Sequence, residues 1–172
     1  MIIIGITGTI GAGKGTIVEY LTHKYGYKHF SVRAFLSKVL KEQGLLPDRD
    51  NLTELANKLR AEHGPSYVTD RLFEEALHSE ANCVIESIRT PGEIYSLRKN
   101  PSFFLFSVDA DPQLRYRRIL ERNTETDRID FLTFVSNEQR EMSSDDPNKQ
   151  NLRKCIELAD FSFTNNSERE SL

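Results

Sequence analysis

The sequence predicts an α/β fold in which a parallel five-stranded sheet is covered by helices on both faces. Three observations support this. Short apolar segments alternate with helical patterns, the segment 2–6 is apolar throughout as in a strand buried on both sides, and most segments end at glycine or proline. With 172 residues and a hydrophobic fraction of 38%, one domain spanning 1–172 is expected to bury a substantial core.

The first half of the chain is predicted to hold three strands and four helices. Gly26, Gly44 and Gly64 each end a helical pattern, and Pro65 suits the first turn of the next helix. The expected strands are 2–6, 27–31 and 83–85, and the expected helices are 14–25, 33–43, 51–63 and 66–79.

The second half is predicted to hold four helices and two strands. Pro91 and Pro112 suit helix starts, and Asp130 can cap a helix whose apolar residues recur with helical spacing. Between these elements, 123–130 is polar and gives no core signal. The expected helices are 91–99, 112–122, 130–142 and 148–158, and the expected strands are 103–108 and 161–164.

A glycine-rich segment follows the first strand directly and leads into a helix. Its spacing from Gly8 to Lys14 fits the Walker A phosphate loop, although Gly15 stands where a hydroxyl is usual and Thr16 follows. Glycines let backbone N–H groups converge on a polyphosphate, and the helix directs its positive dipole end toward it. Lys14 then supplies positive charge to the outer phosphates. The residues expected to bind phosphate are Gly8, Gly11, Ala12, Gly13, Lys14, Gly15 and Thr16.

The carboxyl ends of the strands are the expected functional edge, because ligands of open parallel sheets bind there. Glu86 ends one core strand, and Arg89 lies three residues further on. A carboxylate at this edge can place Mg²⁺, directly or through water, or orient an acceptor. We therefore expect Glu86 to be catalytic and, with Thr16, to serve the metal; a solvated residue at a strand end is the alternative.

Arginines cluster before the polar segment 123–130. Arg115, Arg118 and Arg122 share one helical face, and Arg128 lies within the segment. A mobile segment that carries arginine can exclude water and close positive charge over transferring phosphates. We expect catalytic roles for Arg118, Arg122 and Arg128; a solvated cationic face is the alternative.

A further set of arginines could bind an anionic acceptor, since the planar guanidinium group suits phosphate. Arg33 follows the second strand, Arg60 and Arg71 lie in the helical region of about 33–79, and Arg89 lies at the sheet edge. For each of these arginines, an ordinary surface position is the alternative.

Composition excludes several classes. The net charge of −3 gives no electrostatic basis for binding nucleic acid or an anionic membrane, and the chain carries no apolar run long enough to span a bilayer. The N-terminus also lacks secretory signal features, so we expect a cytoplasmic protein. Cys83 and Cys155 are expected to be core residues. Whether the protein is a monomer or a dimer stays open.

The phosphate loop, the segments 59–65 and 84–89, and Leu158-Ala159-Asp160 together resemble archaeal adenylate-kinase-related proteins, dephospho-CoA kinases and deoxynucleoside-monophosphate kinases. The resemblance implies a three-layer P-loop kinase fold with an acceptor-binding helical region (33–79) and a short lid (123–130). It also implies ATP as phosphoryl donor with Mg²⁺, and small-molecule nucleotides as partners.

Two departures from the family patterns concern the acceptor. The segment 31–36 replaces the Thr-Gly-Asp-x-x-Arg element of adenylate kinases, and the Asp-x-Asp of dephospho-CoA kinases is absent after the second strand. The first hypothesis is a nucleoside- or deoxynucleoside-monophosphate kinase. The alternatives are a dephospho-CoA kinase, which needs a general base for its hydroxyl acceptor, and an ATP-binding switch or assembly factor with weak ATPase activity.

Overall fold

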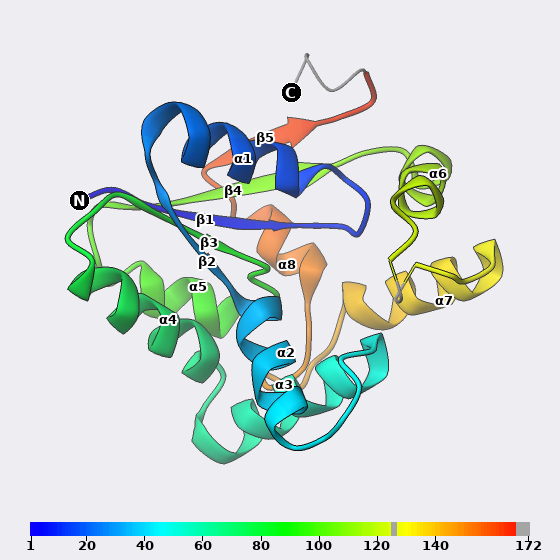
Figure 1. Ribbon diagram of the computed structural model, residues 1–172, viewed down its shortest axis with the longest axis horizontal. Coiled ribbons are helices and arrows are strands. Elements are labelled where there is room, and N and C mark those ends of the chain that lie inside the picture. Colours follow the sequence, from blue (N-terminus) through cyan, green and yellow to red (C-terminus); the bar gives the residue numbers. More distant parts are fainter. Residues whose placement is uncertain (125–126, 168–172) are drawn as a thin grey trace.

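The sheet is parallel throughout and has the strand order β2-β3-β1-β4-β5 (Figure 1). The structure, a computed structural model, describes residues 1–124 and 127–167. The predicted five-stranded parallel sheet is therefore confirmed. Its strands are β1 (Ile3–Gly8), β2 (Lys28–Ser31), β3 (Cys83–Glu86), β4 (Phe103–Asp109) and β5 (Phe161–Thr164).

The helices agree with the sequence pattern to within one residue except at three boundaries: capping side chains set two of the starts, and the helix that begins at Pro91 ends at Leu97 rather than at 99. The Asp48 carboxylate accepts from Asn51 N, so α3 begins two residues earlier than predicted. The Asn151 side chain accepts from Lys154 N, so α8 begins at 152 rather than 148. The helices are α1 (Lys14–Tyr25), α2 (Val32–Glu42), α3 (Arg49–His63), α4 (Tyr67–His78), α5 (Pro91–Leu97), α6 (Pro112–Arg122), α7 (Phe131–Met142) and α8 (Leu152–Glu157).

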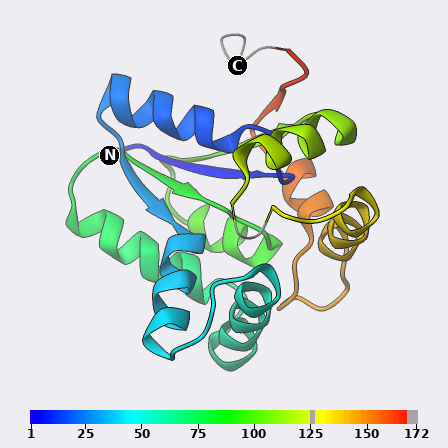
Figure 2. The ribbon, with the colours of Figure 1, turned by 45° about the vertical axis from the view of Figure 1, so that its right-hand side comes forward.

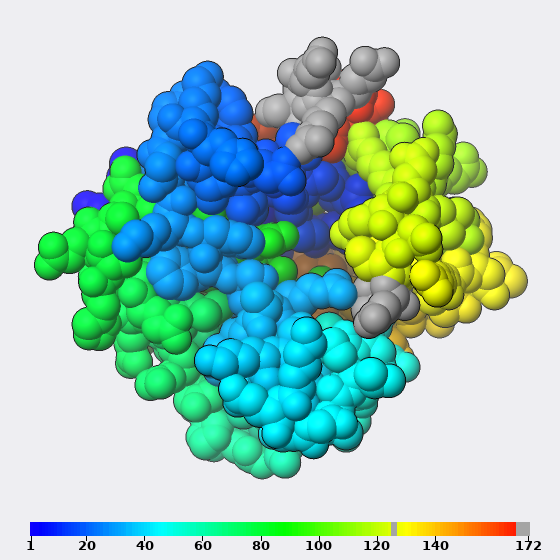
Figure 3. Space-filling model, viewed as in Figure 1, coloured from blue at the N-terminus to red at the C-terminus, as the bar shows by residue number. Residues whose placement is uncertain are grey.

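The helices form two layers around the sheet and two groups beyond its carboxyl edge. Helix α1 covers one face, and α4, α5 and α8 cover the other (Figure 1). Beyond the edge, α2 and α3 stand on one side and α6 and α7 on the other (Figures 1 and 2). The space-filling view shows a hollow between these two groups (Figure 3). Within the described ranges, no helix has both the length and the apolar character needed to cross a bilayer.

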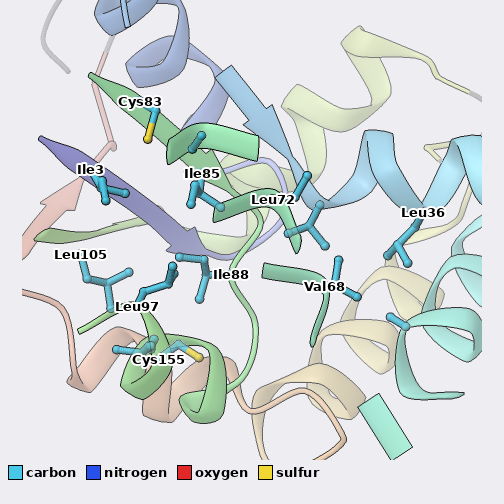
Figure 4. Packing of buried hydrophobic residues seen from close by; sticks show 14 of the residues in the cluster. Ile3, Leu36, Val68, Leu72, Cys83, Ile85, Ile88, Leu97, Leu105 and Cys155 are labelled. Carbon is cyan, nitrogen blue, oxygen red and sulfur yellow. The ribbon is translucent and has the colours of Figure 1, made fainter. Parts of the chain in front are cut away.

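The main core lies on the sheet face that α4, α5 and α8 cover (Figure 4). Ile3 of β1 is fully buried on this face, whereas Ile4 joins the cluster under α1, because successive strand side chains point to opposite faces. Cys83 and Cys155 are both 0% exposed in the main core, which confirms their predicted place. Burial raises the pKa of these thiols to about 11 and about 12 respectively.

Candidate functional site

The phosphate loop joins β1 to α1, and two of its glycines are required by the backbone. Gly8 has φ +130° and Gly11 has φ +75°, conformations that side-chain-bearing residues rarely adopt. A Cβ at Gly8 would lie 2.0 Å from the carbonyl oxygen of Val108, and one at Gly11 would lie 2.5 Å from that of Arg115. The loop is thus packed tightly against β4 and α6 while its other side borders the hollow.

Gly8→Ala is expected to lower the free energy of unfolding by about 2–3 kcal/mol, because it adds backbone strain and a clash with rigid backbone. Gly15→Ala is the matched control, since an added Cβ there meets no atom within 4 Å. In a helical position that change should stabilise the protein by about 0.5–1 kcal/mol. Urea unfolding measures both, and equal effects from the two variants would contradict this account of the loop.

Lys14 lies folded back on the phosphate loop. Its Nζ donates to the carbonyl oxygens of Gly8 (3.0 Å) and Thr9 (2.7 Å). Burial lowers the pKa of Lys14 to about 7, and the positive charge of Arg89 adds to this effect. The ammonium group is therefore short of negative charge, which a bound polyphosphate would supply.

Glu86 ends β3 beside Lys14 and faces the hollow. His29 Nε2 lies 3.2 Å from its Oε2, a contact that the sequence did not reveal. Burial opposes ionisation of Glu86, but His29, Lys14 and Arg89 outweigh it and hold its pKa below the ordinary range. Glu86 is therefore a carboxylate at neutral pH.

The donors available to a metal at this edge are oxygens, which suit Mg²⁺. Thr16 is in the first turn of α1, where its backbone N–H donates to the carbonyl of Gly13 (3.0 Å), and Glu86 supplies a carboxylate. Across the residues that the structure describes, no group of three or more His, Cys, Asp or Glu could hold an ion. A metal here would take its remaining ligands from phosphate and water, as Mg²⁺ commonly does.

The hollow is a pocket of about 170 Å³ between the phosphate loop, the strand ends, and α2 and α3 (Figure 3). Among the residues that the structure describes, six cationic side chains and two acidic ones line it, although the whole chain has a net charge of −3. The cationic residues are Lys14, Arg33, Arg49, Arg60, Arg89 and Arg122, and the acidic residues are Glu86 and Glu141. This excess of positive charge suits an anionic ligand.

Glu141 connects two of the pocket arginines. It lies in the last turn of α7 and is 4% exposed. Arg49 Nη2 donates to its Oε1 (2.6 Å) and Arg89 Nη1 donates to its Oε2 (2.8 Å). Arg89 Nη1 also donates to Gln150 Oε1 (2.8 Å). The sequence analysis identified neither Arg49 nor Glu141.

Two of the predicted acceptor arginines have other surroundings than expected. Arg60 is 1% exposed, and its Nη2 donates to Glu93 Oε1 (3.1 Å), so its charge is compensated at the wall of the pocket. Arg71 is 55% exposed on α4, pairs with Glu74 and does not line the pocket. This placement removes Arg71 from the candidate site, whereas Arg33 and Arg89 do line it.

The predicted cationic face of α6 is divided among different partners. Arg115 is 2% exposed and donates from both terminal nitrogens to Glu138 of α7 (2.5 and 2.8 Å). It also donates to the carbonyl of Ile10 (3.3 Å), so it supports the phosphate loop from behind. The alternative of a solvated cationic face is therefore wrong at Arg115, because the side chain is buried against Glu138 of α7.

Of the three arginines expected over the reaction, only Arg122 lines the pocket. It donates to both carboxylate oxygens of Asp127 (2.6 and 2.7 Å). Arg118 instead donates to the carbonyls of Asn165 (3.0 Å) and Ser167 (3.1 Å), and Arg128 donates to Asn123 Oδ1 (3.2 Å). Part of the predicted lid, 125–126, lies outside the described residues.

Solved structures share this architecture. TT1252 from Thermus thermophilus is 24% identical with a TM-score of 0.62, and the match covers 98% of this chain and 91% of that one. Shikimate kinase from Aquifex aeolicus is 16% identical with a TM-score of 0.51, covering 99% and 90% respectively. These likenesses establish the α/β fold of P-loop kinases for the chain.

Sequence comparison identifies the family. A UPF0200 protein of Methanococcus maripaludis (strain C7) is 30% identical over 168 residues, which is 96% of this chain and 88% of the relative. A family model described as an AAA domain matches residues 4–144. The phosphate loop implies nucleotide binding, and the chain belongs to this AAA-domain family and to the UPF0200 proteins.

Proposed function

We propose that this protein transfers a phosphoryl group from ATP to a small acceptor that itself carries a phosphate, namely a nucleoside or deoxynucleoside monophosphate. The observation that carries the proposal is the pocket beside the phosphate loop, with six cationic side chains against two acidic ones. Positioning and charge neutralisation are the main demands of phosphoryl transfer. Arginine binds phosphate oxygens through paired donors, which suits an acceptor phosphate at the same edge.

Each part of the site has a role in this proposal. The loop from Gly8 to Thr16 binds the ATP phosphates, and Lys14 turns from the loop carbonyls to the outer phosphates. Thr16 and Glu86 hold Mg²⁺, which when bound neutralises charge on the phosphates. Arg33 and Arg89, which both line the pocket, hold the acceptor phosphate, and Arg122 exchanges Asp127 for a phosphate oxygen. Arg118 and Arg128 have no role here.

The state of the pocket carboxylates favours a phosphate acceptor over a hydroxyl acceptor such as dephospho-CoA. A hydroxyl acceptor needs a general base, whereas an ionised phosphate does not. Glu141 has an arginine on each of its oxygens, and Glu86 has His29 on Oε2 and the charge of Lys14 nearby. In the described part of the pocket, both carboxylates are thus already paired and have lowered pKa values, which makes them weak bases.

The test is a panel of ribo- and deoxynucleoside monophosphates, with dephospho-CoA as the hydroxyl acceptor, assayed with ATP and Mg²⁺. We expect ADP formation with at least one monophosphate at 100-fold or more above hydrolysis without acceptor. Arg33→Ala should raise the KM of that acceptor 10-fold or more, because it removes a side chain that donates hydrogen bonds to the acceptor's phosphate. The fold should tolerate the change, since Arg33 is not in the core. Arg71→Ala is the matched control, since it removes an exposed arginine of the same helical region outside the pocket.

If dephospho-CoA were the one active acceptor of the panel, the proposal would be replaced by the alternative in which a hydroxyl group accepts the phosphoryl group. Hydrolysis of ATP that no monophosphate stimulates would contradict both kinase hypotheses. An equal KM change in the two arginine variants would show that the effect of Arg33 is general electrostatics.

A further inference from the structure

Arg49 and Arg89 come from separate elements and meet at one carboxylate. Arg49 begins α3, whereas Arg89 follows β3, and Glu141 of α7 accepts one hydrogen bond from each. Gln150, 7% exposed, accepts a second hydrogen bond from the same nitrogen, Arg89 Nη1. Two long side chains are therefore fixed before any ligand arrives, which lowers the entropy cost of binding.

The charges at this junction do not balance. Two guanidinium groups share a single carboxylate, and Arg49 has a side chain that is only 16% exposed. Burial lowers the pKa of Arg49, and the positive charges of Arg89 and Arg140 add to this against the opposing effect of Glu141. The surplus positive charge faces the same pocket as Lys14. A bound anion would remove this imbalance.

Arg49 also carries a donor without an acceptor. Its Nε–H is buried and has no hydrogen-bond partner within the part of the chain that the structure describes. An unsatisfied buried donor is unfavourable, and in native proteins such a group calls for an explanation. The guanidinium group that carries this donor also lines the pocket, so an oxyanion bound there would add negative charge beside it.

A purely structural role for Arg49 explains less. The contact between α3 and α7 already has an ion pair at its surface, where Arg140 Nη2 donates to Asp50 Oδ1 (3.1 Å). A further ion pair between α3 and α7 would not require Glu141 to accept from a second arginine. It would also not require the pair to border the pocket.

We propose that Arg49 and Arg89, held side by side by Glu141, form a binding subsite for an oxyanion, with Arg49 as a ligand-binding residue and Glu141 as the positioning residue. The ligand class is a phosphate monoester, and the assignment to the acceptor's phosphate rests on the proposed function. This subsite adds a residue on α3 to the acceptor contacts from Arg33 and Arg89.

The experiment follows the arginine Nε–H resonances of the ¹⁵N-labelled full chain while inorganic phosphate is added. Mg²⁺ and a non-hydrolysable ATP analogue fill the phosphate loop throughout, so that the added phosphate is left to bind at the proposed subsite of Arg49 and Arg89. The Arg49 resonance is assigned by its loss in Arg49→Lys. We expect the chemical shift of this resonance to change with phosphate concentration until it saturates. We expect Arg49→Lys to weaken phosphate binding 10-fold or more, because lysine keeps the charge but lacks the paired N–H donors of the guanidinium group.

Arg140→Lys is the matched control, because it alters the exposed tie between the same two helices and should leave phosphate affinity unchanged. An Arg49 resonance that does not respond to phosphate would overturn the subsite, as would equal phosphate affinity of Arg49→Lys and the wild type. If Arg49→Lys fails to fold, through-bond assignment from the Arg49 backbone in ¹³C,¹⁵N-labelled wild-type protein identifies the resonance, and the wild-type titration decides alone. Because no turnover is measured, phosphate binding at Arg49 without any active monophosphate would retain the subsite and reject the kinase proposal. Kinase activity without a shift of the Arg49 resonance would reject the subsite and retain the kinase proposal.

Discussion

Lys14→Met is expected to lower ATP-dependent turnover by 100-fold or more while the protein stays folded. Lys14 supplies the mobile positive charge of the phosphate loop, and loss of one group that stabilises developing charge costs about 10²–10³ in kcat. The fold should tolerate the change, because burial lowers the pKa of Lys14 to about 7 and its charged form gains little from the empty pocket. A coupled assay for ADP with the active monophosphate measures the effect.

Lys24→Met is the matched control, since Lys24 lies on the same helix with its Nζ over the ring of Tyr20 at the exposed surface. It should keep turnover near that of the wild type. Turnover of Lys14→Met within threefold of the wild type would exclude Lys14 from the reaction.

Glu141→Gln is expected to lower the free energy of unfolding by about 3 kcal/mol at pH 7, because it leaves two arginines at a half-buried junction without their shared counter-charge. The effect should depend on pH. Burial opposes ionisation of Glu141, but Arg89 and Arg49 outweigh it and hold its pKa below the ordinary value. A carboxylate with a lowered folded-state pKa stabilises the protein above its unfolded pKa, about 4.3, and loses that contribution as the pH falls further.

The difference between wild type and Glu141→Gln should therefore shrink as the pH is lowered from 7 to 3, which urea unfolding at several pH values measures. Glu157→Gln is the matched control, because Glu157 is 54% exposed and pairs with Lys154 at the surface. A Glu141→Gln effect no larger than that of Glu157→Gln, or one independent of pH, would contradict the account of this junction.

Much of the fold could be predicted because local signals and burial agree. The segment 2–6 is apolar throughout, and β1 pairs with β3 along one edge and with β4 along the other, while α1 and α8 cover its two faces. Glycine and proline set most helix ends within two residues of those observed. The start of α8 was missed by four residues, because the pattern did not show that Asn151 caps the helix.

Most of the predicted residues that line the pocket follow a strand or lie in the phosphate loop; Arg60 of α3 and Arg122 of α6 are the exceptions. Glu86, Arg89 and Arg33 line the pocket because the carboxyl ends of parallel strands share one edge. Positions on α3, α4 and α7 depend on how these helices pack, which periodicity does not fix. Arg71 consequently faces solvent. Glu141 did leave a signal, since it lies seven residues after the buried Phe134 and so places an acid on the apolar face of α7.

The most direct test of the central claim is the chemical form of the product, which ³¹P NMR of the reaction with ATP, Mg²⁺ and the panel of acceptors identifies. A phosphate acceptor predicts a new phosphoanhydride, with resonances of a diphosphate that appear in step with ADP. A new phosphomonoester instead would show that a hydroxyl is the acceptor. ADP and inorganic phosphate as the only products, with every acceptor unchanged, would contradict phosphoryl transfer to an acceptor.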